Sequence, residues 1–141
     1  MTRNAFILLI SNKSSHRVLL IQENNGQWNI PGGRVKHYER SYDAAVRKFH
    51  EETGFLLNEA NITQINRYNI THRNSSKTSI FIINSNQRFP NFSRTPEAID
   101  LHYMPLNDLF DSINDKLYHS KVNSFRSCFK KSFNKIYPTI R

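Results

Sequence analysis

Two adjacent glutamates, Glu51 and Glu52, are well suited to bind a divalent metal ion. They close the segment RKFHEE, in which Arg47 and Lys48 lie about one helical turn earlier. Paired carboxylates on one side of a helix can hold Mg²⁺ or Mn²⁺, because these hard cations prefer oxygen ligands. A lysine in the same place has the opposite effect, since its ammonium group has donors and no acceptor. The segment therefore combines a metal-binding pattern with a competing cation.

An amphipathic helix from about Ser41 to Thr53 must position these residues. Each residue turns a helix by about 100°, which collects the apolar side chains on one face and the charged ones on the other. The apolar face consists of Tyr42, Ala45, Val46 and Phe49. Gly54 follows the last periodic residue, as is typical of a helix end. We expect the apolar face to pack against a sheet and to leave the charged face outward.

A longer motif surrounds this helix. Gly33 ends a Pro-Gly-Gly segment, Glu39 comes six residues later, and Arg47 follows eight residues after Glu39. This spacing resembles the Nudix box, whose pattern is Gly, five residues, Glu, seven residues, and then Arg-Glu-apolar-any-Glu-Glu-any-Gly-apolar. Eight of its nine specified positions match: Gly33, Glu39, Arg47, Phe49, Glu51, Glu52, Gly54 and Phe55. Lys48 stands where the family has its first helix glutamate.

Two further segments are similar to the same family. WNIPGG resembles its Trp-x-x-Pro-Gly-Gly lead-in, and EAIDLHYMPLNDL resembles its late strand followed by Pro-Leu-x-x-Leu. The resemblance implies an α/β fold, a Nudix-type α/β/α sandwich with a mixed β-sheet and a loop-helix-loop catalytic motif. Apolar, β-prone runs at 4–10, 17–22, 61–71 and 78–84 are compatible with such a sheet. The length predicts a single domain, residues 1–141.

The resemblance also implies how the site is built. It implies that Glu51, Glu52 and the carbonyl of Gly33 bind Mg²⁺ or Mn²⁺. It also implies that both glutamates are catalytic residues. It implies that Arg47 and Glu39 hold the loop-helix-loop in shape. A bound metal would neutralise phosphate charge and make a water molecule nucleophilic, which is what hydrolysis of a diphosphate linkage needs.

The resemblance implies a pyrophosphohydrolase that cleaves a nucleoside diphosphate linked to another moiety. Arg34, directly after the glycines, and Lys48 are candidates for binding the phosphate groups of the substrate. The motifs leave the substrate open among nucleoside triphosphates, dinucleoside polyphosphates, nucleotide sugars and capped RNA 5′ ends. They also leave the oligomeric state open.

Lys48 leaves three hypotheses open about activity. In the first, the chain is an active hydrolase whose general base comes from the loop before the late strand, with Glu97 as first candidate and Asp100 as second. In the second, it is a degenerate domain that binds nucleotide or RNA without turnover, with Lys48 holding phosphate. In the third, Lys48 is a deliberate substitution that traps substrate. In each case we expect Lys48 to pair with Glu52, four residues later, and its pKa to rise beside the carboxylates.

The charge of the chain favours an anionic partner. The net charge is +9, and the segment 113–141 contains seven Lys or Arg residues and one Asp. Its apolar residues recur mostly at three- and four-residue steps, which predicts a basic amphipathic helix at about 117–136. A basic surface of this kind is typical of proteins that bind RNA or another polyanion.

The remaining composition predicts a cytoplasmic protein. Cys128 is the single cysteine, which is typical of a reducing compartment. Because it lies between Phe125 and Phe129, we expect its thiol to be buried. The apolar run AFILLI has six residues, which is too short for a membrane span.

Overall fold

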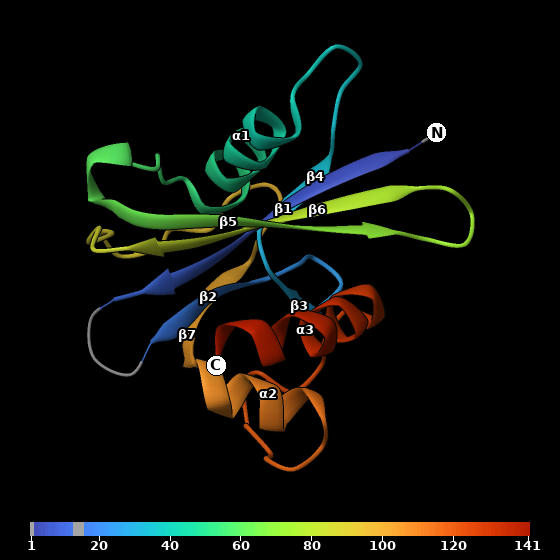
Figure 1. Ribbon diagram of the computed structural model, residues 1–141. Helices are drawn as coiled ribbons and strands as arrows, with labels where there is room; N and C mark the ends of the chain where they lie inside the picture. The colour runs from blue at the N-terminus through green and yellow to red at the C-terminus, as the bar shows by residue number, and fades with distance from the viewer. Residues whose placement is uncertain (1, 13–15) are drawn as a thin grey trace.

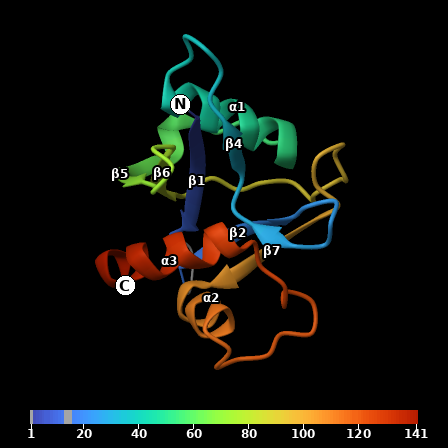
Figure 2. The same ribbon diagram turned by 90° about the vertical axis from the view of Figure 1, so that its right-hand side faces the viewer.

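A seven-stranded mixed sheet separates helix α1 from helices α2 and α3 (Figures 1 and 2). The structure is a computed structural model that describes residues 2–12 and 16–141. Its strands are β1 (Arg3–Ser11), β2 (Arg17–Gln22), β3 (Trp28–Asn29), β4 (Gly32–Arg34), β5 (Ile62–Thr71), β6 (Lys77–Ser85) and β7 (Asp100–Pro105). Its helices are α1 (Ser41–Thr53), the short 3₁₀ helix η1 (Glu59–Asn61), α2 (Leu106–Ile113) and α3 (Ser127–Ile140). The expected α/β/α sandwich is confirmed.

Strand β1 organises the sheet. It pairs in parallel with β6 along its whole length, and antiparallel with β4 near its start and with β2 at its end. Its apolar residues face both layers: Ile7 and Leu9 pack on the side of α1, and Leu8 and Ile10 pack on the side of α2 and α3. A strand that is covered on both faces needs a continuous apolar run, which is why the segment AFILLI does not alternate with polar residues.

Helix α1 packs against the sheet by the face that its sequence predicts. Ala45 and Phe49 are fully buried there, and the edge of the Tyr42 ring contacts Phe81 on β6. Gly54 ends the helix in the left-handed conformation, at φ 78°, and its N–H donates to the carbonyl of His50. This conformation strains residues that have a Cβ atom, so the glycine sets the end of the helix.

The expected helix at 117–136 is wrong in its boundaries. α3 begins at Ser127 and continues to Ile140, while the segment before it is irregular. The backbone N–H of Trp28 donates to Ser124, and the N–H of Arg126 donates to Trp28. Backbone groups that pair with a strand cannot also form helical hydrogen bonds, so the helix starts only after this contact. Within the described residues, no helix has the length and apolar character needed to cross a membrane.

Two other expectations concern Cys128 and the turn between the first two strands. The thiol of Cys128 is exposed, so the expected burial is wrong. Its neighbour Phe129 is buried instead, because one residue turns the helix by about 100° and carries Cys128 away from the core. The segment SNKSSH, residues 11–16, predicts a turn between the first two strands, and half of it lies outside the described residues.

Substitution of Phe49 should show how much stability the packing of α1 supplies. Phe49→Ala removes a ring that is fully buried between α1 and the sheet. We expect a loss of about 3–5 kcal/mol in the free energy of unfolding, measured by urea denaturation. Leu56→Ala is the control, because Leu56 is 68% exposed and its loss should cost less than about 0.5 kcal/mol. Equal effects of the two substitutions would contradict this account of the core.

Candidate active site on the loop-helix-loop

Arg47 connects helix α1 with the end of β4 and with the loop between them. Its Nε and Nη2 atoms donate to the two carboxylate oxygens of Glu39, at 2.9 and 3.0 Å. Nη1 donates to Glu51 Oε1 at 3.0 Å, and Nη2 also donates to the carbonyl of Arg34 at 3.1 Å. A guanidinium group suits this task, because its planar fork of donors fits a carboxylate with two parallel bonds. Arg47 therefore ties α1 to the segment between β4 and α1.

These contacts shift the pKa values of the groups involved. The hydrogen bonds from Arg47 and from the backbone of Lys36 lower the pKa of Glu39 to about 2. The hydrogen bond to Glu39 is in turn the main cause that raises the pKa of Arg47. Both groups therefore keep their charges throughout the neutral range, and their contact persists there.

Lys48 extends from α1 across Gly33 to the loop before β7. Its Nζ atom lies 2.6 Å from Glu97 Oε2 and 3.3 Å from Glu51 Oε2. The expected pairing with Glu52 is wrong, because the side chain reaches these two carboxylates instead. A side chain at Gly33 would contact the alkyl stem of Lys48, so the glycine leaves room for this path.

The pKa of Lys48 is raised, as its neighbours predict. Burial alone would lower the pKa of this ammonium group, but the hydrogen bond to Glu97 and the charges of Glu52 and Glu97 outweigh that effect. Lys48 is thus a permanent cation between the carboxylates. A charged ammonium group has no lone pair, so Lys48 cannot act as a general base.

Glu52 is the buried carboxyl of the site, with 6% exposure. Its Oε1 atom accepts a hydrogen bond from the backbone N–H of Gly32 at 2.7 Å. Burial raises the pKa of Glu52 to about 8, against the opposing effects of the Gly32 hydrogen bond and of Lys48. The carbonyl of Glu52 also accepts from the hydroxyl of Thr95 at 2.9 Å, which holds the loop of Glu97 near α1.

One cavity of about 420 Å³ brings most of the expected site residues together. The predicted residues in its lining are Gly33, Arg34, Lys48, Glu52 and Glu97. Arg47 and Glu39 lie behind it as supports. Glu51 does not line it, and Asp100 instead forms an ion pair with Lys121 at 2.9 Å. Glu97 is therefore the better placed of the two candidate bases.

The expected three-ligand metal set does not fit these positions. Both oxygens of Glu51 are taken by cations, Oε1 by Arg47 and Oε2 by Lys48. Lys48 Nζ also holds Glu97, so an ammonium group occupies the place between the carboxylates where a divalent ion would have to bind. Among the described residues, no group of three or more His, Cys, Asp or Glu side chains could hold a metal ion. Gly33 and Glu52 remain beside the cavity without Glu51.

A second cavity, of about 410 Å³, adjoins the first. The two share Glu23, Gly32 and Gly33. The second has a mixed lining, in which Phe6 and Ile80 of the sheet and Phe129 of α3 are apolar. Most of its other side chains are polar, among them His72, Asn74 and Thr78. A side chain at Gly32 would overlap the ring of Phe6 and the carbonyl of Ala5, so only glycine lets β4 lie this close to β1.

Glu23 is a site residue that the sequence patterns missed. It follows β2 and opens the turn Glu23–Gln27, where its N–H donates to the carbonyl of Gln27 at 2.8 Å. The pattern ENNGQ indicated only a turn. Glu23 is the first acidic residue after a buried strand, and this position is the only sign of its role in the sequence. No spacing rule connects it with the glycines that it faces.

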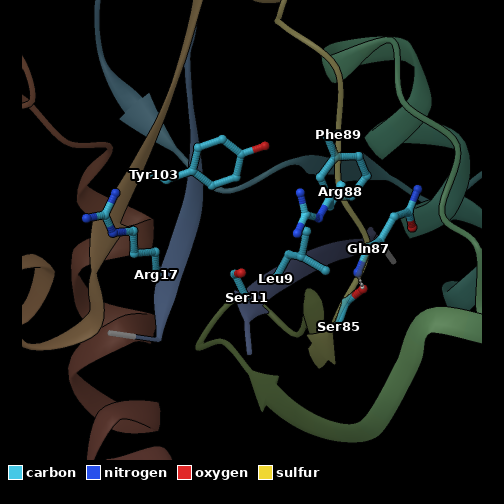
Figure 3. Close-up of a pocket in the computed structure, with 8 residues that line it drawn as sticks. All are labelled: Leu9, Ser11, Arg17, Ser85, Gln87, Arg88, Phe89 and Tyr103. Atoms are coloured by element: carbon cyan, nitrogen blue, oxygen red, sulfur yellow. Dashed lines mark hydrogen bonds between the residues drawn. The ribbon is translucent and has the colours of Figure 1, made fainter. Parts of the chain in front are cut away.

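A third cavity, of about 500 Å³, lies at the opposite end of β1 (Figure 3). Arg88 and Phe89, from the segment after β6, belong to its lining. Figure 3 shows the hydroxyl of Tyr103 directed to the side on which these two residues lie. The ring of Phe89 stacks on Phe55, with centroids 4.9 Å apart, so it serves packing at least in part. None of the loop-helix-loop carboxylates lines this cavity.

Comparison with known proteins agrees with this geometry. The family model described as NUDIX domain matches residues 1–125. A Schizosaccharomyces pombe protein named as a probable nudix hydrolase is 33% identical over 137 residues, which cover 89% of this chain and 46% of that protein. The human protein named nucleoside diphosphate-linked moiety X motif 6 is 26% identical over 138 residues, covering 93% and 43%. The chain belongs to the Nudix family.

Solved structures share the fold. A Caenorhabditis elegans Ap4A hydrolase, solved as a binary complex, has a TM-score of 0.64 at 15% identity, covering 97% of this chain and 99% of that one. A Mycobacterium smegmatis Nudix hydrolase has a TM-score of 0.67 at 17% identity, covering 98% and 86%. At these identities the similarity shows the fold alone. The chain spans less than half the length of the curated relatives that it matches.

The contact between Arg47 and Glu39 should make stability depend on acid pH. The folded state holds the pKa of Glu39 near 2, against an ordinary value of 4.5. Its contribution to the free energy of unfolding is therefore complete above about pH 4.5 and is lost as the pH falls toward 2. Urea denaturation across this range should show a shallower acid loss in Glu39→Gln than in the wild type. Asp43→Asn, which removes an exposed ion pair with Arg40, should retain the wild-type slope.

Replacement of Lys48 should create a metal site. Lys48→Glu removes the ammonium group that holds Glu51 and Glu97, and adds a carboxylate beside them. We expect Mn²⁺ to bind this variant at least on the order of tenfold more tightly than the wild type, as measured by calorimetry. Lys36→Glu makes the same charge change outside the cavity and should leave Mn²⁺ binding unchanged. Equally tight binding to the wild type would show that Lys48 moves aside for the metal.

Proposed function

We propose that this chain is a Nudix-type pyrophosphohydrolase that cleaves a nucleoside diphosphate linked to another moiety. The observation that supports this proposal is the junction of two cavities at Gly32 and Gly33. One cavity carries charged groups suited to a phosphoric anhydride. The other combines the aromatic rings of Phe6 and Phe129 with polar side chains, a mixed lining suited to a nucleoside. Residues 1–141 act in this proposal as a single domain.

Two cations of the first cavity bind the phosphate groups. Lys48 and Arg34 both line it, and each supplies positive charge where the anhydride would lie. Charge on the equatorial oxygens of a transferring phosphoryl group is stabilised by such cations. Gly33 leaves room for the alkyl stem of Lys48, so this cation can reach the cavity that the anhydride would occupy.

Glu97 is the general base in this proposal. Its side chain is 40% exposed at the cavity, so a water molecule can reach it. The water oxygen forms a new bond to phosphorus as the anhydride P–O bond breaks. Glu97 takes the proton of the water, and the leaving phosphate departs with the bonding electron pair. Glu52, held by the N–H of Gly32, positions the glycine segment beside the reacting phosphorus.

A second candidate function is nucleotide binding without turnover. It is favoured by the short contact between Lys48 Nζ and Glu97 Oε2, which engages the proposed base with a permanent cation. In this case Lys48 and Arg34 hold the phosphates, and no group is free to activate water. RNA is included among the ligands of this candidate, since the net charge of +9 favours a polyanion.

A substrate panel distinguishes the two functions. The panel contains a nucleoside triphosphate, a dinucleoside polyphosphate, a nucleotide sugar and a capped RNA, each with Mg²⁺, with Mn²⁺ and with a chelator. We expect the wild type to release a nucleoside monophosphate or phosphate from at least one of them. Glu97→Gln should reduce the rate by about 100-fold or more, the usual effect of removing a general base, and Glu52→Gln should also lose activity.

Glu59→Gln is the matched control, because Glu59 is exposed on η1 and lines neither cavity. It should retain the wild-type rate. Absence of turnover under every condition, together with nucleotide or RNA binding that weakens with salt, would overturn the hydrolase and support the second candidate. Full activity in Glu97→Gln would overturn its role as base.

A further inference from the structure

Glu23 lies at the boundary between the two cavities. Among the described residues that form the walls, three line both cavities: Glu23, Gly32 and Gly33. On one side Glu23 faces the cavity of Lys48 and Glu52, and its charge is one of the causes that raise the pKa of Glu52. On the other side it faces the cavity of Phe6 and Phe129. Its backbone is fixed by the turn, since Gly26 N–H donates to its carbonyl at 2.9 Å.

One carboxylate oxygen of Glu23 is not satisfied. Oε1 is buried and has no hydrogen-bond partner among the described residues. The nearest cation is Arg126, whose Nε atom lies 3.6 Å away, within ion-pair range and beyond hydrogen-bond length. Oε1 itself is enclosed, but the side chain is 24% exposed and lines both cavities. The carboxylate has only this one long ion pair, so it can accept a further hydrogen bond from a ligand at the cavity wall.

The order of groups in a nucleotide indicates which donor this is. If the phosphates occupy the cavity of Lys48 and the base occupies the cavity of Phe6 and Phe129, the ribose lies at their boundary. A ribose presents two hydroxyl groups, and a carboxylate is the acceptor that proteins commonly use for them. An amino group of the base would lie deeper in the second cavity, away from Glu23.

We propose that the carboxylate of Glu23 accepts a hydrogen bond from a ribose hydroxyl, so that the site selects ribonucleotides over deoxyribonucleotides. This inference rests on the proposed function only in that a nucleotide occupies the two cavities. It does not require turnover. It narrows the substrate class to ribonucleotide derivatives, and it makes Glu23 the residue that determines sugar specificity.

Calorimetric binding of diphosphates tests this role. The ligands are adenosine and guanosine diphosphate, each compared with its 2′-deoxy and 3′-deoxy forms. We expect the wild type to bind the ribose form on the order of tenfold more tightly than at least one deoxy form, the usual effect of a hydrogen bond to a charged group. Glu23→Ala should lose this preference through weaker binding of the ribose form alone. Glu59→Ala should retain it.

Each other outcome has a distinct meaning. Equal binding of the ribose and deoxy forms by the wild type, or a preference that survives in Glu23→Ala, would overturn the role of Glu23 and leave the proposed function intact. Failure to bind any of the nucleotides would overturn both. Inosine diphosphate tests whether the affinity depends on the base and not on the sugar. Such a dependence would place Glu23 against an amino group of the base and would overturn the ribose contact.

Glu23→Gln covers the case in which the alanine variant does not fold. It keeps the shape of the side chain and a neutral acceptor, so the ribose preference should become smaller without disappearing. Arg126→Ala separates sugar specificity from the ion pair between the turn and the chain before α3. Arg126 also lines the second cavity, so the affinity for both sugar forms can fall together in this variant. The ribose preference should persist in that variant, and its loss there would show that Glu23 acts through Arg126 alone.

Discussion

The guanidinium group of Arg47 is the constraint on which the loop-helix-loop depends. It makes four hydrogen bonds, to both oxygens of Glu39, to Glu51 and to the carbonyl of Arg34. These partners come from the segment before α1 and from α1 itself. Without them, the charged chain between β4 and α1 would have little reason to adopt one path, because most of its side chains are exposed. The position of Gly33 beside α1 follows from this contact.

The second controlling feature is the charge balance around Lys48. A carboxylate cluster in a partly buried site needs positive charge, since isolated buried charges are expensive. Here the positive charge is covalently attached, as the ammonium group of Lys48 between Glu51 and Glu97. A tethered cation cannot leave or be exchanged, whereas a bound metal can. The chain thereby keeps the architecture of its family while its electrostatics differ at the residue where family members carry an acid.

The two cavities exist because β1 shares its pairing among several strands. It pairs with β4 near its start and with β2 only at its end, so Gly32 and Gly33 enter the space that the separation of β2 from β1 leaves open. The turn after β2 then brings Glu23 to the same place, and the Asn24 side chain donates to the carbonyl of Pro96 in the loop that carries Glu97. Three segments that are distant in the sequence thus meet around two glycines. Their side chains line the charged cavity, and Glu23 and the two glycines also line the adjoining one.

The sequence by itself determined the local elements and the supports of the site. Periodicity predicted α1 and its buried face, and the spacing of Glu39, Arg47 and Glu51 predicted residues that the fold brings into contact, because contacts within a helix and its flanking loop are short-range. Only the tertiary structure decided that Lys48 reaches Glu97, 49 residues away, and not Glu52, and that Glu23 faces the glycines. It also decided that α3 begins at Ser127, since Trp28 takes the backbone groups just before it. Such long-range contacts compete with the contacts that local patterns favour. The periodicity of a sequence does not show which of the two forms.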